Sequence, residues 1–245
     1  MNENLSRKLY PLLGLALGLV GAGCRFLLYA LGMDEKGLLV PGHPAAVLLW
    51  VVTAAAVLAA VLAAMTFRED NKAPDETCRS IPEALGTAVM ALGAFSTLLL
   101  PENNGIATLL RLHRILSVLA FFCLLAAAVF RLMGKPVPFG CYAGAAVFFF
   151  VHVVTRYRAW SGNPQMADYL HALGAGLCLS LVSYYETALV VGLGGRRQRF
   201  ALGILGIFCC VAAAARGEYP ALHLCGAVWI LSVLLTVRPG ESKEL

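Results

Sequence analysis

Charged residues are scarce in this sequence. Of its 245 residues, 13% are Asp, Glu, Lys or Arg and 60% are hydrophobic, whereas soluble domains carry about 25% charged residues and are about half apolar. The mean hydropathy of +0.77 agrees with this imbalance. The composition therefore excludes an ordinary soluble enzyme. It indicates a polytopic membrane protein, because much of the chain consists of apolar runs and a membrane-spanning helix needs about 20 apolar residues.

Motifs for catalysis, metal binding and redox chemistry are also missing. The sequence has no Cys-x-x-Cys pair, no Gly-x-Ser-x-Gly motif and no His-x-x-x-His spacing. The cysteines lie mostly in or beside apolar runs and are interpreted as small core residues. We therefore expect no metal, no cofactor and no assignable catalytic residue. Four histidines lie on different apolar runs and are interpreted as hydrogen-bonded links between helices: His113, His152, His171 and His223. The alternatives are that two of them bind haem or that three of them bind zinc beside Asp168.

A basic or polar domain is absent as well. The formal net charge is +5, but the 19 Lys and Arg residues are scattered through the chain. Nucleic acid is therefore not an expected partner. The one sizeable polar segment, residues 68–80, carries charges of both signs and is interpreted as a solvated cytoplasmic loop. Residues 1–245 are expected to form a single transmembrane domain in contact with the lipid bilayer.

What the sequence does contain is long apolar runs separated by charged residues, Pro and Gly. Lipid offers no hydrogen-bond partner to an open backbone group, and the runs show no alternation typical of barrel strands, so they are predicted to be helices. The predicted fold class is all-α, a polytopic bundle of about eight transmembrane helices. The predicted spans are 9–32, 44–67, 82–100, 107–132, 138–157, 164–191, 199–216 and 219–237.

Two of the predicted spans begin with a local helix-start signal. Ser80 precedes Pro82 and Glu83, which predicts a helix start with a capping box between Ser80 and Glu83. Asn163 and Pro164 predict the start of the sixth span in the same way.

The distribution of positive charge predicts the orientation of the bundle. With the N-terminus in the cytoplasm, twelve of the 19 Lys and Arg residues fall on the cytoplasmic side, in keeping with the excess of positive charge on cytoplasmic loops. We therefore expect both termini in the cytoplasm. The twelve residues are Arg7, Lys8, Arg68, Lys72, Arg79, Arg131, Lys135, Arg196, Arg197, Arg199, Arg238 and Lys243.

Ionisable residues inside the apolar runs are the best candidates for a site, because charge within a membrane is costly and usually faces the bundle interior. Arg25 recurs at helical spacing with Gly14, Gly18 and Gly21, so we expect it to face the bundle. The equal alternative is an Arg that extends along the lipid to the outer interface. The other candidates gather at the predicted outer end: Arg111, Arg114, His152, Arg156, Arg158, Asp168, His171, Glu218 and His223.

This outer cluster has two interpretations. In the first, pairs between arginines and acids simply tie helix ends together. In the second, converging arginines form an outward-facing pocket that binds or transports an anionic small molecule or a lipid headgroup, because guanidinium groups bind carboxylate and phosphate well. The pocket hypothesis predicts a border of Arg25, Arg111, Arg114 and Arg156.

Near the predicted inner end of the sixth span, Tyr185 and Glu186 form a separate polar group. Glu186 is interpreted as an acid that pairs with an arginine or bonds to a tyrosine. A role in proton relay is the alternative.

Small residues spaced four apart support a second function, that of a non-catalytic structural or assembly subunit. The segments Gly14-x-x-x-Gly18 and Gly140-x-x-x-Gly144 suit close packing of helices. The partner helix would belong to the same chain, to a second copy in a homo-oligomer or to another protein. A membrane-embedded enzyme is the third hypothesis, which no sequence motif supports.

One segment resembles a known group of proteins. Residues 156–165 read Arg-Tyr-Arg-Ala-Trp-Ser-Gly-Asn-Pro-Gln and are followed by Asp168 and Tyr169. The segment is similar to Trp-Ser-x-Asp-Pro-Gln-x-x-Asp-Tyr in uncharacterised small multi-spanning membrane proteins of anaerobic Gram-positive bacteria. Asn163 stands where those proteins more often have Asp, and both residues cap helices. The resemblance implies a location in a bacterial plasma membrane and no particular activity.

Overall fold

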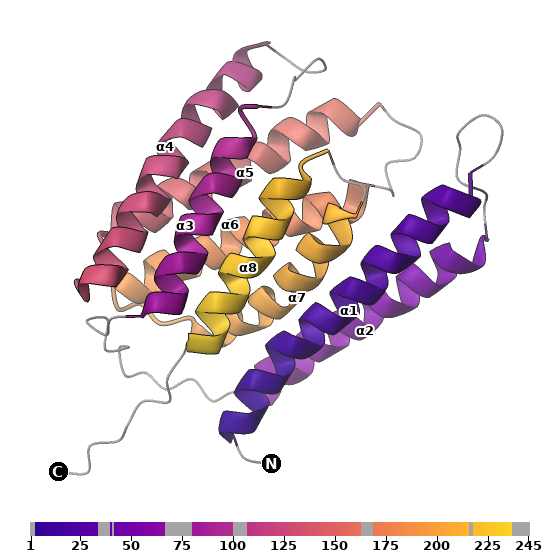
Figure 1. Cartoon of the computed structure of the whole chain (residues 1–245), viewed down its shortest axis with the longest axis horizontal. Helices are drawn as coiled ribbons and strands as arrows, with labels where there is room; N and C mark the ends of the chain where they lie inside the picture. Colours follow the sequence, from indigo (N-terminus) through magenta and orange to yellow (C-terminus); the bar gives the residue numbers. More distant parts are fainter. Residues whose placement is uncertain are drawn as a thin grey trace.

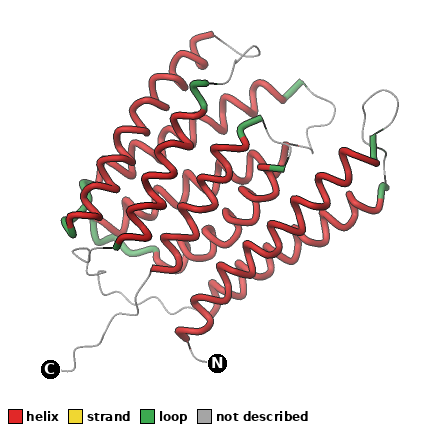
Figure 2. The backbone as a smooth tube through the Cα atoms, in the orientation of Figure 1, coloured by secondary structure: helices red, strands yellow, loops and turns green. Residues whose placement is uncertain are grey.

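The computed structural model describes residues 3–33, 40, 42–66, 80–99, 107–162, 169–215 and 218–236. Within these ranges the chain forms eight α-helices and no β-sheet (Figure 2), which confirms the all-α class. The helices are α1 (Glu3–Leu31), α2 (Pro44–Thr66), α3 (Ile81–Ser96), α4 (Ala107–Met133), α5 (Phe139–Trp160), α6 (Leu170–Val190), α7 (Arg196–Ala214) and α8 (Pro220–Thr236).

Six of these helices are long and apolar enough to cross a membrane: α1, α2, α4, α5, α6 and α7. The other two, α3 and α8, have 16 and 17 residues. At about 1.5 Å per residue they are roughly 25 Å long, somewhat less than the roughly 30 Å hydrocarbon core of a bilayer. Eight spans therefore remain a prediction, whereas six span-length helices are present.

The order of helix neighbours closes a ring of six helices. Each helix from α3 to α8 packs on the next one, and α8 returns to pack on α3. Helices α1 and α2 pair with each other and lie against α7 at one side of the ring (Figure 1). Because α7 is enclosed by α1, α2, α6 and α8, most of its side chains are buried.

Successive helices run in opposite directions, which gives the bundle two distinct ends. Helix α1 begins and α8 ends at the same end (Figure 1), which we call the termini end. The opposite end, where α1 ends and α8 begins, is called the far end. The termini end corresponds to the predicted cytoplasmic side, and the far end corresponds to the predicted outer side.

Glycines allow α1 to approach α7 closely. A Cβ atom at Gly14 would lie 3.0 Å from the backbone oxygen of Ile204, and one at Gly18 would lie 2.9 Å from Cβ of Val211. Gly21 faces the ring of Phe208 in the same interface. The small-residue face of α1 is therefore used within the chain, as close helix packing requires.

The second small-residue face, on α5, is used in part. A Cβ atom at Gly144 would lie 3.1 Å from Sγ of Cys123 on α4. A Cβ atom at Gly140 would have nothing within 4 Å among the described residues. Among the described residues, close helix packing thus accounts for a glycine at position 144 but not for one at position 140.

Two glycine turns end α4 and α6. Gly134 has a φ of 64°, in the left-handed region, and the Lys135 N–H donates to the carbonyl five residues earlier at 3.0 Å. Gly192, with a φ of 76°, ends α6 in the same pattern, which satisfies carbonyls that the helix leaves open. These turns fix where the helices stop, so Arg131 and Glu186 lie in or near the last turn at the termini end.

The capping box predicted at the start of α3 is wrong. Ser80 makes no side-chain capping hydrogen bond, although a proline does occupy the first turn as predicted. Glu83 instead forms an ion pair with Arg131 of α4. A charged partner binds a carboxylate more strongly than a backbone N–H does, which explains the choice. The predicted start at Asn163 and Pro164 lies outside the described residues.

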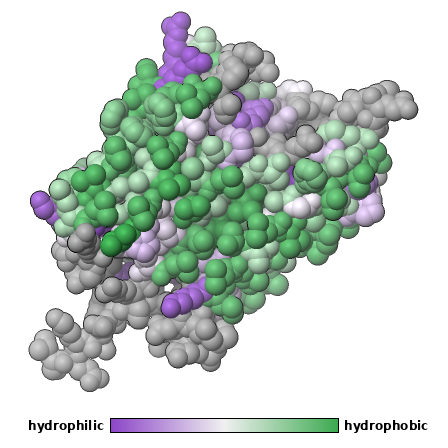
Figure 3. Space-filling model, in the orientation of Figure 1, coloured by the Kyte–Doolittle hydropathy of each residue, from purple (hydrophilic) through white to green (hydrophobic). Residues whose placement is uncertain are grey.

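The bundle is apolar outside and polar in places inside. Figure 3 shows hydrophobic side chains over most of the visible face, and Leu19 and Phe122 are 61% and 60% exposed. An outer surface so rich in large apolar side chains is consistent with contact with lipid. The charged side chains that are buried include Arg25, Glu83, Arg156, Glu186 and Arg199.

Candidate functional site

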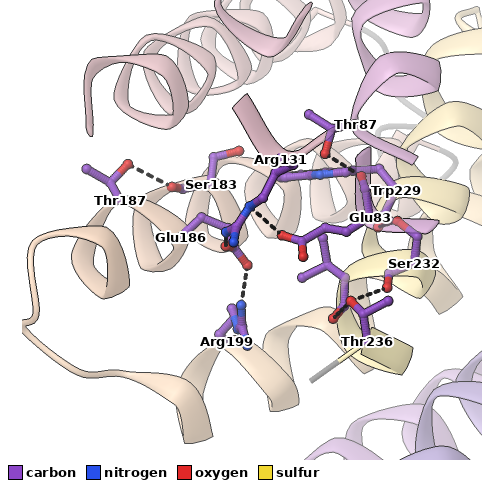
Figure 4. Close-up of polar contacts among 11 residues, drawn as sticks. Glu83, Thr87, Arg131, Ser183, Glu186, Thr187, Arg199, Trp229, Ser232 and Thr236 are labelled. Carbon is purple, nitrogen blue, oxygen red and sulfur yellow. Dashed lines mark hydrogen bonds and ion pairs between the residues drawn. The ribbon is translucent and has the colours of Figure 1, made fainter. Parts of the chain in front are cut away.

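Four charged side chains from four helices meet at the termini end (Figure 4), and we call them the ion-pair cluster. They are Glu83 of α3, Arg131 of α4, Glu186 of α6 and Arg199 of α7. Nε of Arg131 lies 3.0 Å from Oε1 of Glu83, and its Nη2 lies 3.9 Å from Oε2 of Glu186. Arg199 donates from Nη1 to Oε1 of Glu186. Two negative and two positive charges therefore compensate one another.

Burial makes this compensation necessary. Glu186 is 1% exposed, and the buried phenol of Tyr142 lies beside Arg131. Removing an ion from water costs several kcal/mol, which only close pairing offsets. The arginine pairing predicted for Glu186 is thus confirmed. Tyr185 is not its partner in the described contacts, and packs its ring against Tyr184.

The rest of this cluster is not predicted by the sequence patterns. Those patterns place Glu83 in a helix cap, and Arg131 and Arg199 among the cytoplasmic charges that set the orientation. A usable signal was nevertheless present, because each residue lies within two turns of the end of a predicted span. Paired charges at one end of antiparallel helices are typical of such positions.

At the far end, two histidines meet in the core, and we call them the histidine pair. Nε2 of His113 on α4 lies 2.9 Å from Nδ1 of His152 on α5. Phe148 stacks on His113 with 5.5 Å between ring centroids, and Tyr219 meets His152 edge-on at 5.2 Å. One neutral imidazole donates and the other accepts, so the two rings share a single N–H···N hydrogen bond. The predicted role of these histidines as links between helices is confirmed for this pair.

Arg156 lies one turn after His152 and joins α5 to the start of α8. Its Nη1 donates to Oε2 of Glu218 at 3.3 Å, and Nε1 of Trp160 donates to Oε1 of the same carboxylate at 3.0 Å. The guanidinium also lies 4.5 Å from the centre of the Tyr219 ring. Because the Glu218 side chain is 48% exposed, this contact lies near the edge of the bundle.

On the other side of the far end, Arg25 points into the bundle, as predicted. Its side chain is buried and donates from Nη1 to the backbone oxygen of Ala212 on α7 at 3.2 Å. It lies within electrostatic range of His171 on α6 and His223 on α8. Nε2 of His171 is 3.1 Å from Oγ1 of Thr53 on α2. We call Arg25, His171 and His223 the Arg25 group.

His223 connects the two parts of the far end. It is 1% exposed and lies within electrostatic range of both Arg25 and His152. Its Nδ1 has no hydrogen-bond partner among the described residues. A buried polar atom left without a partner costs about 1–3 kcal/mol. Such an atom calls for an explanation, and a bound ligand is one.

The remaining predicted site residues do not join this buried group. Arg111 and Arg114 on α4 and Arg158 on α5 are exposed. Of the four arginines predicted to border one pocket, only Arg25 and Arg156 are buried. Asp168 lies outside the described residues.

No group of three or more His, Cys, Asp or Glu side chains is placed to hold a metal ion in the described part of the chain. The chemistry that the far end offers is therefore that of hydrogen-bond donors and positive charge: guanidinium groups and imidazoles around an apolar core.

Comparisons of the chain with protein-family models, with curated proteins and with solved structures give no match. The resemblance to proteins of anaerobic Gram-positive bacteria therefore stays a prediction.

Proposed function

We propose that this chain is a membrane protein that binds an oxyanion at its far end through the Arg25 group and carries it across the membrane. The oxyanion is a carboxylate or a phosphate, on a small solute or on a lipid headgroup. The observation that supports this most is Nδ1 of His223, which is buried within electrostatic range of Arg25 and has no hydrogen-bond partner among the described residues. An oxygen atom that accepts a hydrogen bond there removes the cost of the unmade bond.

The chemistry of the Arg25 group suits such a ligand. A guanidinium is always charged and presents a fork of N–H donors that matches carboxylate and phosphate oxygens. The imidazole of His223 donates from Nδ1 when that nitrogen carries the hydrogen. Charge-assisted hydrogen bonds are stronger in a dry, low-dielectric interior than in water. Both donors are buried, which favours tight binding of an anion with several oxygen atoms.

Passage across the membrane is the second part of the proposal. Buried polar groups extend from Arg25 through His223 to the histidine pair, each within electrostatic range or hydrogen-bond distance of the next, within the otherwise apolar interior of the far half. The termini end is closed by charges that bind one another. A carrier opens its site to one side at a time, and separation of the ion-pair cluster would open the termini end.

Thermal unfolding of the detergent-purified protein tests the binding. Sodium sulfate supplies an oxyanion that stays charged near neutral pH, and sodium chloride at equal ionic strength is the reference. Sulfate should raise the unfolding midpoint of the wild type, with a gain of about 2.7 kcal/mol at a concentration about 100 times Kd. Because sulfate also stabilises proteins without binding, the decisive comparison is between variants. Arg25→Gln should lose most of the gain, and Arg111→Gln, on the surface of α4, should keep it.

The same variants show whether the oxyanion belongs to a solute or to a lipid. Nanodiscs of phosphatidylglycerol or of phosphatidylcholine are prepared with each protein, and retained lipid is counted by native mass spectrometry. Retention of phosphatidylglycerol that is lost in Arg25→Gln indicates a headgroup. Sulfate stabilisation without any lipid preference indicates a free solute. An equal sulfate gain in the wild type and Arg25→Gln would overturn the proposal and favour the structural-subunit hypothesis.

A further inference from the structure

The histidine pair lies beside the proposed oxyanion site without belonging to it. His113 is fully buried, and His152 is 3% exposed. We propose that this pair takes up one proton when the oxyanion binds, so that anion binding is coupled to protons. The inference rests on the proposed function, because it names the coupling ion of the same site.

The distance between the two rings limits the pair to one extra proton. With 2.9 Å between Nε2 of His113 and Nδ1 of His152, only one hydrogen fits between these nitrogens. In the neutral pair, one ring donates this hydrogen and the other accepts it. A hydronium ion from the solvent gives up a proton: one of its O–H bonds breaks, a water molecule remains, and an N–H bond forms at the outward-facing nitrogen of the donating ring. The shared hydrogen bond then becomes charge-assisted. A second proton would place two hydrogens face to face and break the contact.

Electrostatics link this proton to the oxyanion. His152 lies within electrostatic range of His223, and His223 lies within range of Arg25. An anion held by Arg25 and His223 therefore offsets a positive charge on the histidine pair. The coupling is reciprocal: if the anion favours the proton, the proton favours the anion by the same factor.

The other groups around the pair explain why the proton should arrive with the anion. Burial away from water is the main factor that disfavours a positive charge on the histidine pair without the anion. The guanidinium groups of Arg114 and Arg156 repel that charge further. The anion compensates that repulsion. The charged or titratable groups that act on the pair are Arg114 of α4, Arg156 of α5 and His223 of α8, and the ring of Tyr219, before α8, contacts His152. Thr97, which follows α3, is neutral and bonds to Ser117 of α4.

Isothermal titration calorimetry of sulfate binding measures the proton count. The titration is repeated near neutral pH in two buffers with different enthalpies of ionisation, and the dependence of the heat on the buffer gives the protons taken up per sulfate. The wild type should take up about one proton, and its affinity should rise by up to about tenfold for each unit of falling pH. His113→Gln and His152→Gln should still bind sulfate, but at least about tenfold more weakly than the wild type near neutral pH, with no proton uptake and no pH dependence.

The matched control is His43→Gln, which makes the same chemical change elsewhere. His43 accepts a hydrogen bond from the Ala45 N–H at the start of α2, away from the histidine pair. This variant should keep both the affinity and the proton uptake of the wild type. Loss of proton uptake in His43→Gln, with retention in His113→Gln and His152→Gln, would overturn the inference.

The outcomes separate this inference from the proposed function. Sulfate binding by the wild type without proton uptake would overturn the inference and leave the proposed function standing. Absence of sulfate binding would overturn both. If the glutamine variants do not fold, nuclear magnetic resonance of the wild type with ¹⁵N-labelled histidine decides. Nitrogen–nitrogen coupling within the pair, with signals that move toward the charged form on addition of sulfate, is expected; unchanged signals would overturn the inference.

Discussion

The two ends of the bundle both bury polar side chains, but the chemistry of those side chains differs. At the termini end, carboxylates and guanidinium groups occur in equal number, and each is bonded to another member of the ion-pair cluster. At the far end, the buried ionisable groups are histidines and two arginines, and no buried carboxylate lies among them in the described part of the chain. Buried charge alone therefore does not mark a site. Charges that cancel hold helices together, and buried positive groups without a buried acid favour an anionic ligand.

The largest effect should follow from a change at the termini end. Glu186→Gln removes the carboxylate shared by Arg131 and Arg199 and leaves two buried positive charges poorly compensated. Loss of one partner from a buried pair costs about 3–5 kcal/mol. We expect a free energy of unfolding lower by about that amount, measured by denaturant unfolding in detergent.

Glu218→Gln is the control for this change. It removes a carboxylate that also pairs with a buried arginine, but the Glu218 side chain is 48% exposed. Because water reaches the Glu218 carboxylate, this variant should lose no more than about 1 kcal/mol of the free energy of unfolding. An equal loss of unfolding free energy in Glu186→Gln and Glu218→Gln would contradict the stronger charge pairing described for the termini end.

The next largest effect should come from the contact of α1 with α7. Leu at Gly18 would collide with Val211, because even a Cβ atom there lies 2.9 Å from Cβ of that residue. Overpacking of this kind costs about 1–3 kcal/mol. Since α1 also carries Arg25, Gly18→Leu should weaken sulfate binding, which calorimetry measures. At Gly23, an added Cβ atom has nothing within 4 Å among the described residues. Gly23→Ala should therefore change neither the free energy of unfolding nor the sulfate affinity. A loss of sulfate binding in this variant would contradict the proposed orientation of α1.

A smaller effect on stability, with a large effect on binding, is expected at His223. Phe fills a similar volume without the open nitrogen, so His223→Phe removes an unsatisfied polar atom. Such a replacement is nearly neutral or stabilising in the absence of ligand, within about 1 kcal/mol. Sulfate affinity should nevertheless fall by at least about tenfold, which corresponds to one lost hydrogen bond in the site. Thermal unfolding with and without sulfate measures both quantities, and unchanged affinity would remove His223 from the site.

The smallest effect is expected for Arg111→Gln. The residue is exposed on α4 and does not join the buried group. The free energy of unfolding should change by no more than about 0.5 kcal/mol, and the sulfate affinity should not change. A clear loss of sulfate affinity would support the wider pocket, bordered by Arg111 as well, that is predicted from the sequence.

Much of the fold could be predicted because lipid leaves the backbone few choices. Apolar runs must form helices, and charged residues, Pro and Gly set where they end. The fourth predicted span, 107–132, thus coincides with α4 to within one residue. The orientation of Arg25 could also be predicted, because the glycines that share its face require a close helix neighbour.

The pairing of side chains across helices could not be predicted from one sequence. Hydropathy does not say that α3 packs between α4 and α8, so the contact of Glu83 with Arg131 was not expected. Nor does it fix how α4 is rotated. That rotation buries His113 against His152 and leaves Arg111 and Arg114 exposed, although all three positions lie within one turn.

The most direct test of the difference between the two ends is to locate a bound oxyanion. Crystals of the wild-type protein grown with selenate, a sulfate analogue that scatters anomalously, would show its position in an anomalous difference map. The site proposed here predicts a peak within hydrogen-bond distance of Arg25 and Nδ1 of His223, and none beside Arg131 or Arg199. A peak at the ion-pair cluster, or no peak at the far end at selenate concentrations that stabilise the protein, would contradict it.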